Sequence, residues 1–145
     1  SVKIETIEAL ASWLAVSTVS HRILCGDFNT PRREYADGSL DTFARNHPDD
    51  FLRWDQAERR LLTGLKHWDL SDVFRTLNGY ENEEDSWFPV RRTGKPHRGH
   101  RLDHLYASVS MRAMRCEYIH GWRENGLSDH SAIEAIFDPV VVARD

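Results

Sequence analysis

The spacing of apolar residues predicts two longer helices and one short helix. Over residues 3–17, apolar positions recur with the 3.6-residue period of an amphipathic helix, and Ser1 stands where a capping residue is expected. A second helical pattern covers residues 54–65. A short pattern covers residues 69–77 and ends ahead of Gly79, a residue type that commonly closes helices.

Short apolar runs predict about five strands. The run over residues 21–26 ends at Gly26 and is typical of a strand buried on both faces. The mixed, polar residues 31–53 are expected to form a loop. Further strands are predicted over residues 86–90, 101–108, 115–120 and 132–137. The pattern therefore predicts an α/β or α+β fold class, with one mixed β-sheet of about five strands and helices on one face.

The composition is that of a folded chain without membrane segments. The 145 residues are 40% hydrophobic and 29% charged, so we expect residues 1–145 to form a single domain. A net charge of −4 excludes a wholly basic nucleic-acid-binding surface. No apolar run reaches the roughly 18–20 residues that a membrane helix needs, so no membrane partner is expected. Cys25 and Cys116 form no motif, and we expect free thiols in a reducing cytoplasm.

The end of the first predicted strand carries two side chains that suit a metal ion or a reacting water. Asp27 and Asn29 are two residues apart, so on an extended backbone both side chains project to the same side. A carboxylate and a carboxamide placed in this way can hold a divalent cation or orient a water molecule. The alternative is a structural turn, because Asp and Asn commonly hydrogen-bond the nearby backbone.

His130 is the second candidate for chemistry. It follows Ser128 and Asp129, but these three are not expected to form a serine-hydrolase triad. Adjacent residues on an extended chain point in opposite directions, and no Gly-x-Ser-x-Gly motif is present. His130 by itself can act as a general acid or bind phosphate. The alternative is a histidine in a turn ahead of the last strand.

A basic segment over residues 91–101 suits a ligand that carries phosphate. It holds five Lys and Arg residues, Arg98 and Arg101 among them, and two histidines in an otherwise acidic chain. The alternative is a solvated hairpin loop. Asp103 follows this segment and could orient a histidine or form a surface ion pair with Arg101.

These pieces, in their order over residues 3–137, resemble motifs of the endonuclease/exonuclease/phosphatase superfamily, and most closely its exonuclease III and apurinic/apyrimidinic endonuclease branch. Residues 26–29 resemble the family's GDFN motif, residues 99–104 resemble G-W-R-[IL]-D-[YH], and residues 127–130 resemble the closing SDH motif. Residues 69–75 and 86–87 resemble the segments that lie between them. The resemblance implies one half of a DNase I-like four-layer sandwich.

The resemblance also implies a phosphoester hydrolase that depends on Mg²⁺, or on Mn²⁺ in its place. Asp27 would activate the attacking water, Asn29 would help to hold water or phosphate, and Asp103 would orient His130 against the scissile phosphate. The implied metal ligands are Asp27, Asn29, Asp129 and His130. The implied contacts with nucleic acid or another phosphoester are Trp87, Arg98 and Arg101.

The resemblance covers the second half of the family domain. Glu5 and Glu8 lie in a predicted helix and do not resemble the family's Gln-Glu metal motif, and nothing else ahead of Asp27 does so. Two functions therefore stay open. One is a metal-dependent hydrolase, either a fragment of an enzyme or a half-domain that a separate N-terminal half completes. The other is a non-catalytic half-domain that binds phosphate or a partner.

A missing half would leave an apolar sheet face without cover. A homodimer that packs sheet on sheet would bury this face, with both copies using the same surface. The residues expected to contribute are Ile23, Leu24, Cys25, Ile133, Ala135, Ile136 and Phe137.

Overall fold

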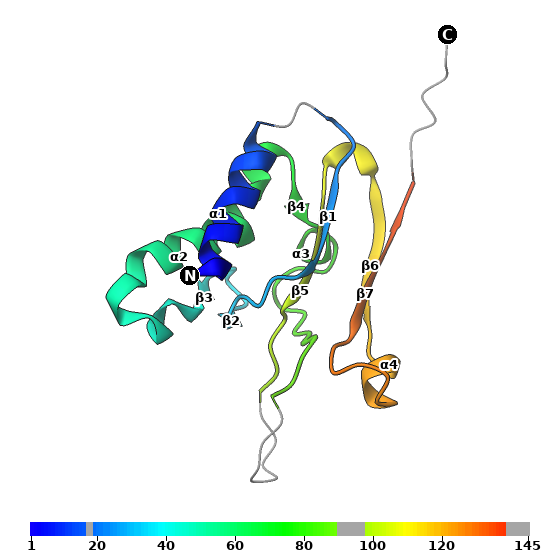
Figure 1. Cartoon of the computed structure of the whole chain (residues 1–145). Coiled ribbons are helices and arrows are strands. Elements are labelled where there is room, and N and C mark those ends of the chain that lie inside the picture. Colours follow the sequence, from blue (N-terminus) through cyan, green and yellow to red (C-terminus); the bar gives the residue numbers. More distant parts are fainter. Residues whose placement is uncertain (17–18, 90–97, 139–145) are drawn as a thin grey trace.

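The computed structural model describes residues 1–16, 19–89 and 98–138 (Figure 1). Its helices are α1 (Val2–Ala15), α2 (Phe51–Arg59), α3 (Val73–Asn78) and α4 (Gly121–Glu124). Its strands are β1 (Ile23–Asp27), β2 (Arg33–Glu34), β3 (Leu40–Asp41), β4 (Ser71–Asp72), β5 (Asp103–Ala107), β6 (Ala113–Ile119) and β7 (Ala132–Phe137). The described chain therefore belongs to the mixed α+β class.

The strands form three small antiparallel sheets, with the orders β1-β5-β4, β2-β3 and β6-β7. The prediction of one mixed sheet of about five strands is therefore wrong. The segment predicted as a strand over residues 86–90 explains the difference. In its described part only Trp87 pairs, through single bridges to His100 and His130. Single bridges do not make a ladder that would merge the sheet of β5 with the sheet of β7.

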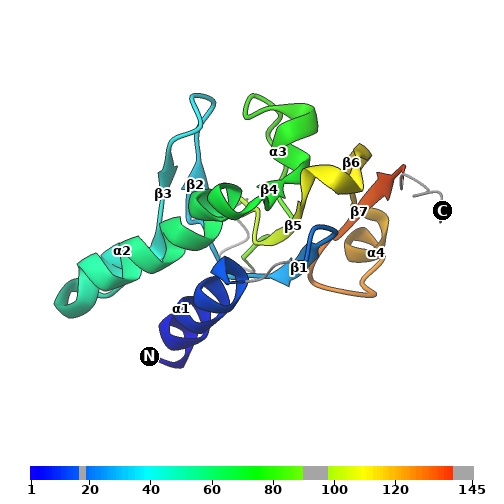
Figure 2. The same cartoon turned by 90° about the horizontal axis from the view of Figure 1, so that it is seen from above.

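β5 is buried on both of its faces. Tyr106 packs in one apolar cluster with α1 and α2, whereas its neighbours Leu105 and Ala107 pack in a second cluster with α3 and the β6-β7 pair. This division follows from the alternation of side chains along a strand. In Figures 1 and 2, α1 and α2 lie on one side of β1 and β5, and β6 and β7 lie on the other. Helices were predicted to cover one face alone. This is wrong, because α3 packs on the second face.

β1 is not buried on both faces, which corrects a second prediction. It is the edge strand of its sheet and has one neighbour, β5. Leu24 packs against the cluster of α1 and α2, whereas Ile23 is 46% exposed and Cys25 is exposed. A short apolar run has the same composition in an edge strand as in a central one, so the sequence does not distinguish the two.

The chain itself partly covers the apolar side of β7. Ile133, Ala135 and Phe137 were expected to need a partner, but they pack against the second cluster, beside α3 and β5. Ile136, on the other side of β7, is 43% exposed, close to the value for Ile23 of β1. A homodimer stays a prediction, with a smaller apolar surface to bury than the sequence indicated.

The predicted helices are present but end at different residues. The pattern over residues 3–17 corresponds to α1, in which Ser1 takes the capping position without a side-chain hydrogen bond. The pattern over residues 54–65 corresponds to α2, which a π-helical turn, Arg60–Gly64, and a 3₁₀ turn, Leu65–Trp68, prolong.

α3 begins four residues later than predicted because Asp72 caps it. The Asp72 carboxylate accepts a hydrogen bond from the backbone N–H of Arg75 at 3.1 Å, in the manner of an N-cap. The helix ends at Asn78, one residue beyond the predicted end, and Gly79 follows with a φ of 73°. Glycine adopts a positive φ without the steric penalty that a side chain brings, which makes it a common helix stop.

Residues 31–53 are more ordered than the predicted loop. They contain the β2-β3 hairpin and two 3₁₀ turns, Phe43–Asn46 and Pro48–Asp50. Each hairpin strand has only two residues, which is too short for a periodic pattern to be visible in the sequence. This segment matters for function because it brings Glu34, Phe43 and His47 against other parts of the chain.

None of the helices in the described residues combines the length and the apolar character that crossing a membrane requires. Cys25 and Cys116 are both free thiols, as predicted.

Candidate active site

The ends of two paired strands bring two carboxylates together. Asp27 is the last residue of β1 and Asp103 is the first residue of β5. The strands are antiparallel, and their register sets Asp27 directly opposite Asp103. Directly opposite residues in an antiparallel pair have their side chains on the same face, so this register creates a pair of acids at one end of the sheet.

Asn29 holds the carboxylate of Asp27. Its backbone N–H donates to Asp27 Oδ1 at 2.8 Å, and its side-chain Nδ2 donates to Asp27 Oδ2 at 3.1 Å. The φ of Asn29 is 51°, in the left-handed region that Asn tolerates better than most residues. The structural turn that the sequence left open is therefore present, and the same turn fixes an acid at the strand end.

His130 reaches the same place from the segment ahead of β7. Its Nδ1 donates to Asp103 Oδ2 at 2.7 Å, which confirms the hydrogen bond predicted from the sequence. The bridges that Trp87 forms with His100 and with His130 join the segments ahead of β5 and β7. Because an ionised carboxylate can only accept, Nδ1 of His130 carries the hydrogen, and Nε2 has no hydrogen-bond partner among the described residues.

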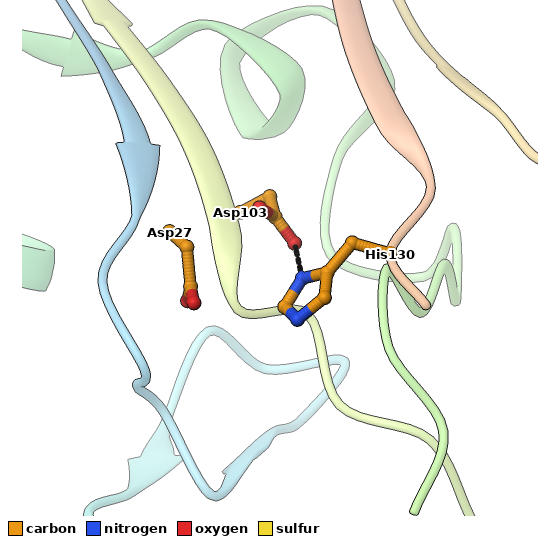
Figure 3. A group of neighbouring side chains, drawn as sticks. All are labelled: Asp27, Asp103 and His130. Atoms are coloured by element: carbon orange, nitrogen blue, oxygen red, sulfur yellow. Dashed lines mark hydrogen bonds and ion pairs between the residues drawn. The ribbon is translucent and has the colours of Figure 1, made fainter. Parts of the chain in front are cut away.

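Asp27, Asp103 and His130 form one compact group, shown in Figure 3. One ligand atom from each residue lies within 4.8 Å of the others. Asp27 is exposed, whereas Asp103 and His130 are partly buried. The side chains come from three segments that are far apart in the sequence and converge on one space that a ligand can reach from the Asp27 side.

The surroundings raise the pKa of His130. Burial by itself would lower this pKa, because it disfavours the charged ring. The hydrogen bond and the charge of Asp103 outweigh burial, and the charges of Asp27 and Asp129 add to its effect. The imidazolium form is therefore favoured, and a positive charge at this position suits contact with a phosphate.

The donor set fits a divalent cation that keeps much of its water. Two carboxylates are ligands that both Mg²⁺ and Mn²⁺ accept. Several acceptor positions are already used, since Asp27 accepts two hydrogen bonds from Asn29 and Asp103 accepts one from His130. A cation held by the oxygen positions that remain would bind weakly, because Mg²⁺ gives up its waters reluctantly.

Two of the expected residues lie beside this group rather than in it. Asp129 was expected to be a metal ligand, but the group of three contains Asp103 in its place, and Asp129 lines the adjoining cleft. Trp87 lines the same cleft, and its ring lies 6.3 Å from the His130 ring between centroids. Trp87 is thus placed beside the candidate site, where a substrate contact was expected.

Arg101 lies in the protein interior. It is 5% exposed, and its guanidinium donates to Glu34 at 2.6 and 2.8 Å and to Asp72 at 2.6 Å. Burial by itself would raise the pKa of Glu34, but the bonds from Arg101 and Arg75 lower it to about 2. The guanidinium that was expected to contact phosphate is instead held by acids of its own chain.

Arg98 and the basic segment are described only in part. Arg98 is exposed, and its Nη2 lies 3.6 Å from a carboxylate oxygen of Glu83. Residues 90–97, which hold most of the predicted basic segment, lie outside the described residues.

A cleft of about 540 Å³ opens beside His130. Aromatic rings follow one another along it, with centroid distances of 5.7 Å from Phe43 to His100, 6.0 Å from His100 to Trp87 and 6.3 Å from Trp87 to His130. The remaining lining residues are Lys3, Asn29, Asn46, His47, Trp54, Leu102 and Asp129. We call this space the aromatic cleft.

Sequence reasoning missed the residues that brace the loop after β1. The buried carboxylate of Glu58 accepts hydrogen bonds from Lys3 Nζ at 2.7 Å, from Thr30 Oγ1 at 2.7 Å and from the backbone N–H of Phe43 at 2.9 Å. Lys3 Nζ also donates to the backbone oxygen of Asn29 at 2.9 Å. A signal was available, because Glu58 lies on the apolar face of the predicted helix, four residues after Trp54, where a carboxylate requires a partner.

Comparison with known proteins gives no family for this chain. No protein-family model matches it, and no curated protein does so.

Proposed function

We propose that this chain hydrolyses phosphoesters with the help of Mg²⁺ or Mn²⁺, as an endonuclease/exonuclease/phosphatase-type protein. The observation that carries the proposal is the convergence of Asp27, Asp103 and His130 within 4.8 Å. Each of them comes from a segment that resembles a motif of that family. The proposal assigns a base, a histidine and its orienting carboxylate to this chain, and it leaves further metal ligands to a partner half or a second copy.

Asp27 acts as the base. Its side chain is the exposed member of the group, and two hydrogen bonds from Asn29 fix its orientation. The carboxylate takes a proton from a water molecule whose oxygen forms a new bond to phosphorus, while the bond from phosphorus to the leaving oxygen breaks. Asp27 then returns its proton to solvent, and the leaving oxygen takes a proton from solvent.

His130 contacts the phosphate as negative charge gathers on it. Its Nε2 is the free ring nitrogen, because Nδ1 donates to Asp103. The pKa of His130 is raised, which favours the protonated ring, and in that form Nε2 donates a charge-assisted hydrogen bond to a phosphate oxygen. Asp103 acts through the histidine by fixing its orientation and its tautomer.

A divalent cation held by Asp27 and Asp103 would neutralise charge on the phosphate oxygens. The weak binding expected of this chain agrees with a centre that needs additional acids from a partner half or a second copy.

The proposal is tested by hydrolysis of bis(p-nitrophenyl) phosphate and of plasmid DNA with Mg²⁺ or Mn²⁺. We expect slow turnover that EDTA abolishes and that Asp27→Asn and His130→Gln each reduce by about 10²-fold or more. Asp138→Asn is the matched control, because Asp138 forms a half-exposed ion pair with Arg112 and lies outside the group. Turnover that Asp27→Asn leaves unchanged would overturn the proposal. Phosphate binding without any turnover would do so too, and would favour the non-catalytic half-domain.

A further inference from the structure

Two groups of rings line the aromatic cleft. The first group is the row of Phe43, His100 and Trp87, whose rings lie 5.7 and 6.0 Å apart between consecutive centroids. The second group is His47 and Trp54, whose rings are stacked at 3.4 Å with an interplanar angle of 8°. The row of rings ends at His130, so the cleft leads directly to the candidate active site.

A positive charge and several hydrogen-bonding groups accompany these rings. Lys3 Nζ lies 5.5 Å from the centroid of the Phe43 ring and 5.3 Å from that of the Trp54 ring. The side chains of Asn46 and Asp129 also line the cleft and supply donors and acceptors. Leu102 is the only aliphatic residue among the described lining residues.

This lining selects one chemical class of ligand. A lipid chain would need an aliphatic surface, and the cleft has almost none. A flat, heteroaromatic ring with polar edges can stack on Phe43, His100 or Trp87 and hydrogen-bond to the amide and carboxylate groups around it. Nucleobases have this combination of faces and edges, and they occur attached to phosphoesters.

We propose that the aromatic cleft binds an unpaired nucleobase next to the phosphate, so that the substrate is a single-stranded nucleic acid. This inference rests on the proposed function for the position of the phosphate at His130. A base in a duplex has both faces covered by its neighbours and its pairing edge occupied, so it cannot stack in a cleft until it leaves the duplex. Lys3 is held by Glu58 and by the Asn29 carbonyl, so its ammonium group has a fixed position at the cleft.

Binding is measured without turnover, by tryptophan fluorescence during titration with eight-nucleotide strands in EDTA. The probes are single-stranded oligoadenylate and oligodeoxyadenylate, a blunt DNA duplex and an abasic strand of the same length. We expect both single strands to bind more tightly than the duplex and the abasic strand, by roughly tenfold or more. The difference in affinity between the RNA strand and the DNA strand identifies which of the two nucleic acids the cleft prefers.

Two variants remove rings from the cleft, and one control leaves it intact. Phe43→Leu and His100→Leu are each expected to weaken binding of the single strands by roughly 5- to 100-fold. Trp13→Leu should leave it unchanged, since Trp13 is an exposed aromatic residue of α1 outside the cleft. Circular dichroism checks that each variant is folded, and the second ring variant keeps the test open if one of them is not.

The outcomes separate this inference from the proposed function. Equal affinity for single strand and duplex, or for strands with and without bases, would overturn the base-binding cleft. Unchanged affinity in both folded ring variants would do the same. Single-strand binding that depends on Phe43 and His100, together with no hydrolysis of any phosphoester, would support the cleft and overturn the proposed function.

Discussion

The carboxylate of Glu58 in α2 accepts a hydrogen bond from the hydroxyl of Thr30 at 2.7 Å, and both side chains are fully buried. The same carboxylate accepts from Lys3 of α1 and from the backbone N–H of Phe43. One buried acid therefore connects α1, α2 and the loop that follows Asp27. Both the candidate active site and the aromatic cleft depend on the position of that loop.

We expect Glu58→Gln to lower the free energy of unfolding by about 1–3 kcal/mol, since it removes the charge that pairs with Lys3 and leaves buried donors imperfectly satisfied. Urea denaturation followed by tryptophan fluorescence measures the change. Glu8→Gln is the control, because the ion pair of Glu8 with Arg53 is exposed to solvent. This substitution should leave the midpoint of urea denaturation nearly unchanged. Equal effects of the two substitutions would contradict the bracing role of Glu58.

Asp103→Asn is expected to lower the pKa of His130. Burial already acts to lower this pKa, and the substitution removes the strongest interaction that raises it. A raised histidine pKa stabilises the fold fully below the unfolded-state value near 6.5, and the contribution is lost as pH rises through the folded value. NMR titration of the His130 ring gives the shift directly, and Asp129→Asn should produce a smaller decrease. An unchanged titration in Asp103→Asn would show that the 2.7 Å bond is not formed in solution.

Glu34 should make the protein sensitive to acid. Its pKa is lowered to about 2 by Arg101 and Arg75 against the effect of burial. The stabilisation is present above the unfolded-state pKa near 4.5 and is lost as pH falls toward about 2. We expect Glu34→Gln to flatten the dependence of stability on pH in this window, and to cost about 2–4 kcal/mol at neutral pH because two buried guanidiniums lose a partner. Chemical denaturation at a series of pH values measures both effects.

The control for this prediction is Glu117→Gln. Glu117 pairs with Arg115 at 3.5 Å on the exposed surface, so its removal should leave the pH dependence intact. If both substitutions flattened the curve alike, the acid sensitivity would arise from overall charge rather than from the buried pair.

Cation binding by the chain alone should be weak. With few free carboxylate oxygens in the group, we expect a dissociation constant for Mg²⁺ or Mn²⁺ on the order of 10⁻³ M. Calorimetry should detect binding in the wild-type chain, no binding in Asp27→Asn, and unchanged binding in Asp138→Asn. A low-micromolar constant would show that further acids of this chain complete the site.

Elements with a long local pattern could be predicted from the sequence. β7 has the predicted bounds, residues 132–137, and α1 begins and ends within two residues of its predicted limits. The three residues of the candidate site could also be named in advance, because Asp27, Asp103 and His130 stand in short motifs with a fixed order. Their meeting within 4.8 Å then follows from the pairing of β1 with β5 and from the bridges of Trp87.

Features that depend on distant pairing could not be predicted. The division into three sheets arises because Trp87 forms only single bridges among the described residues, to His100 and to His130. The residue types in the segment 86–90 do not show how many backbone pairs it will form. The exposure of β1 depends on its place at an edge of the sheet. The aromatic cleft depends on a hairpin and 3₁₀ turns within residues 31–53, which have no periodic signal.

The sequence by itself determined the helical and extended segments and the acids and histidine of the candidate site, because helix and strand periods and short motifs are local properties of a chain. Only the tertiary structure decided which charged groups pair. Arg101 stands in a basic stretch of the sequence, yet Glu34, 67 positions away, and Asp72 take its guanidinium into the interior. Charges in an interior of low dielectric constant must find a partner. The packing of the β2-β3 hairpin, rather than the neighbours of Arg101 in the chain, supplies Glu34.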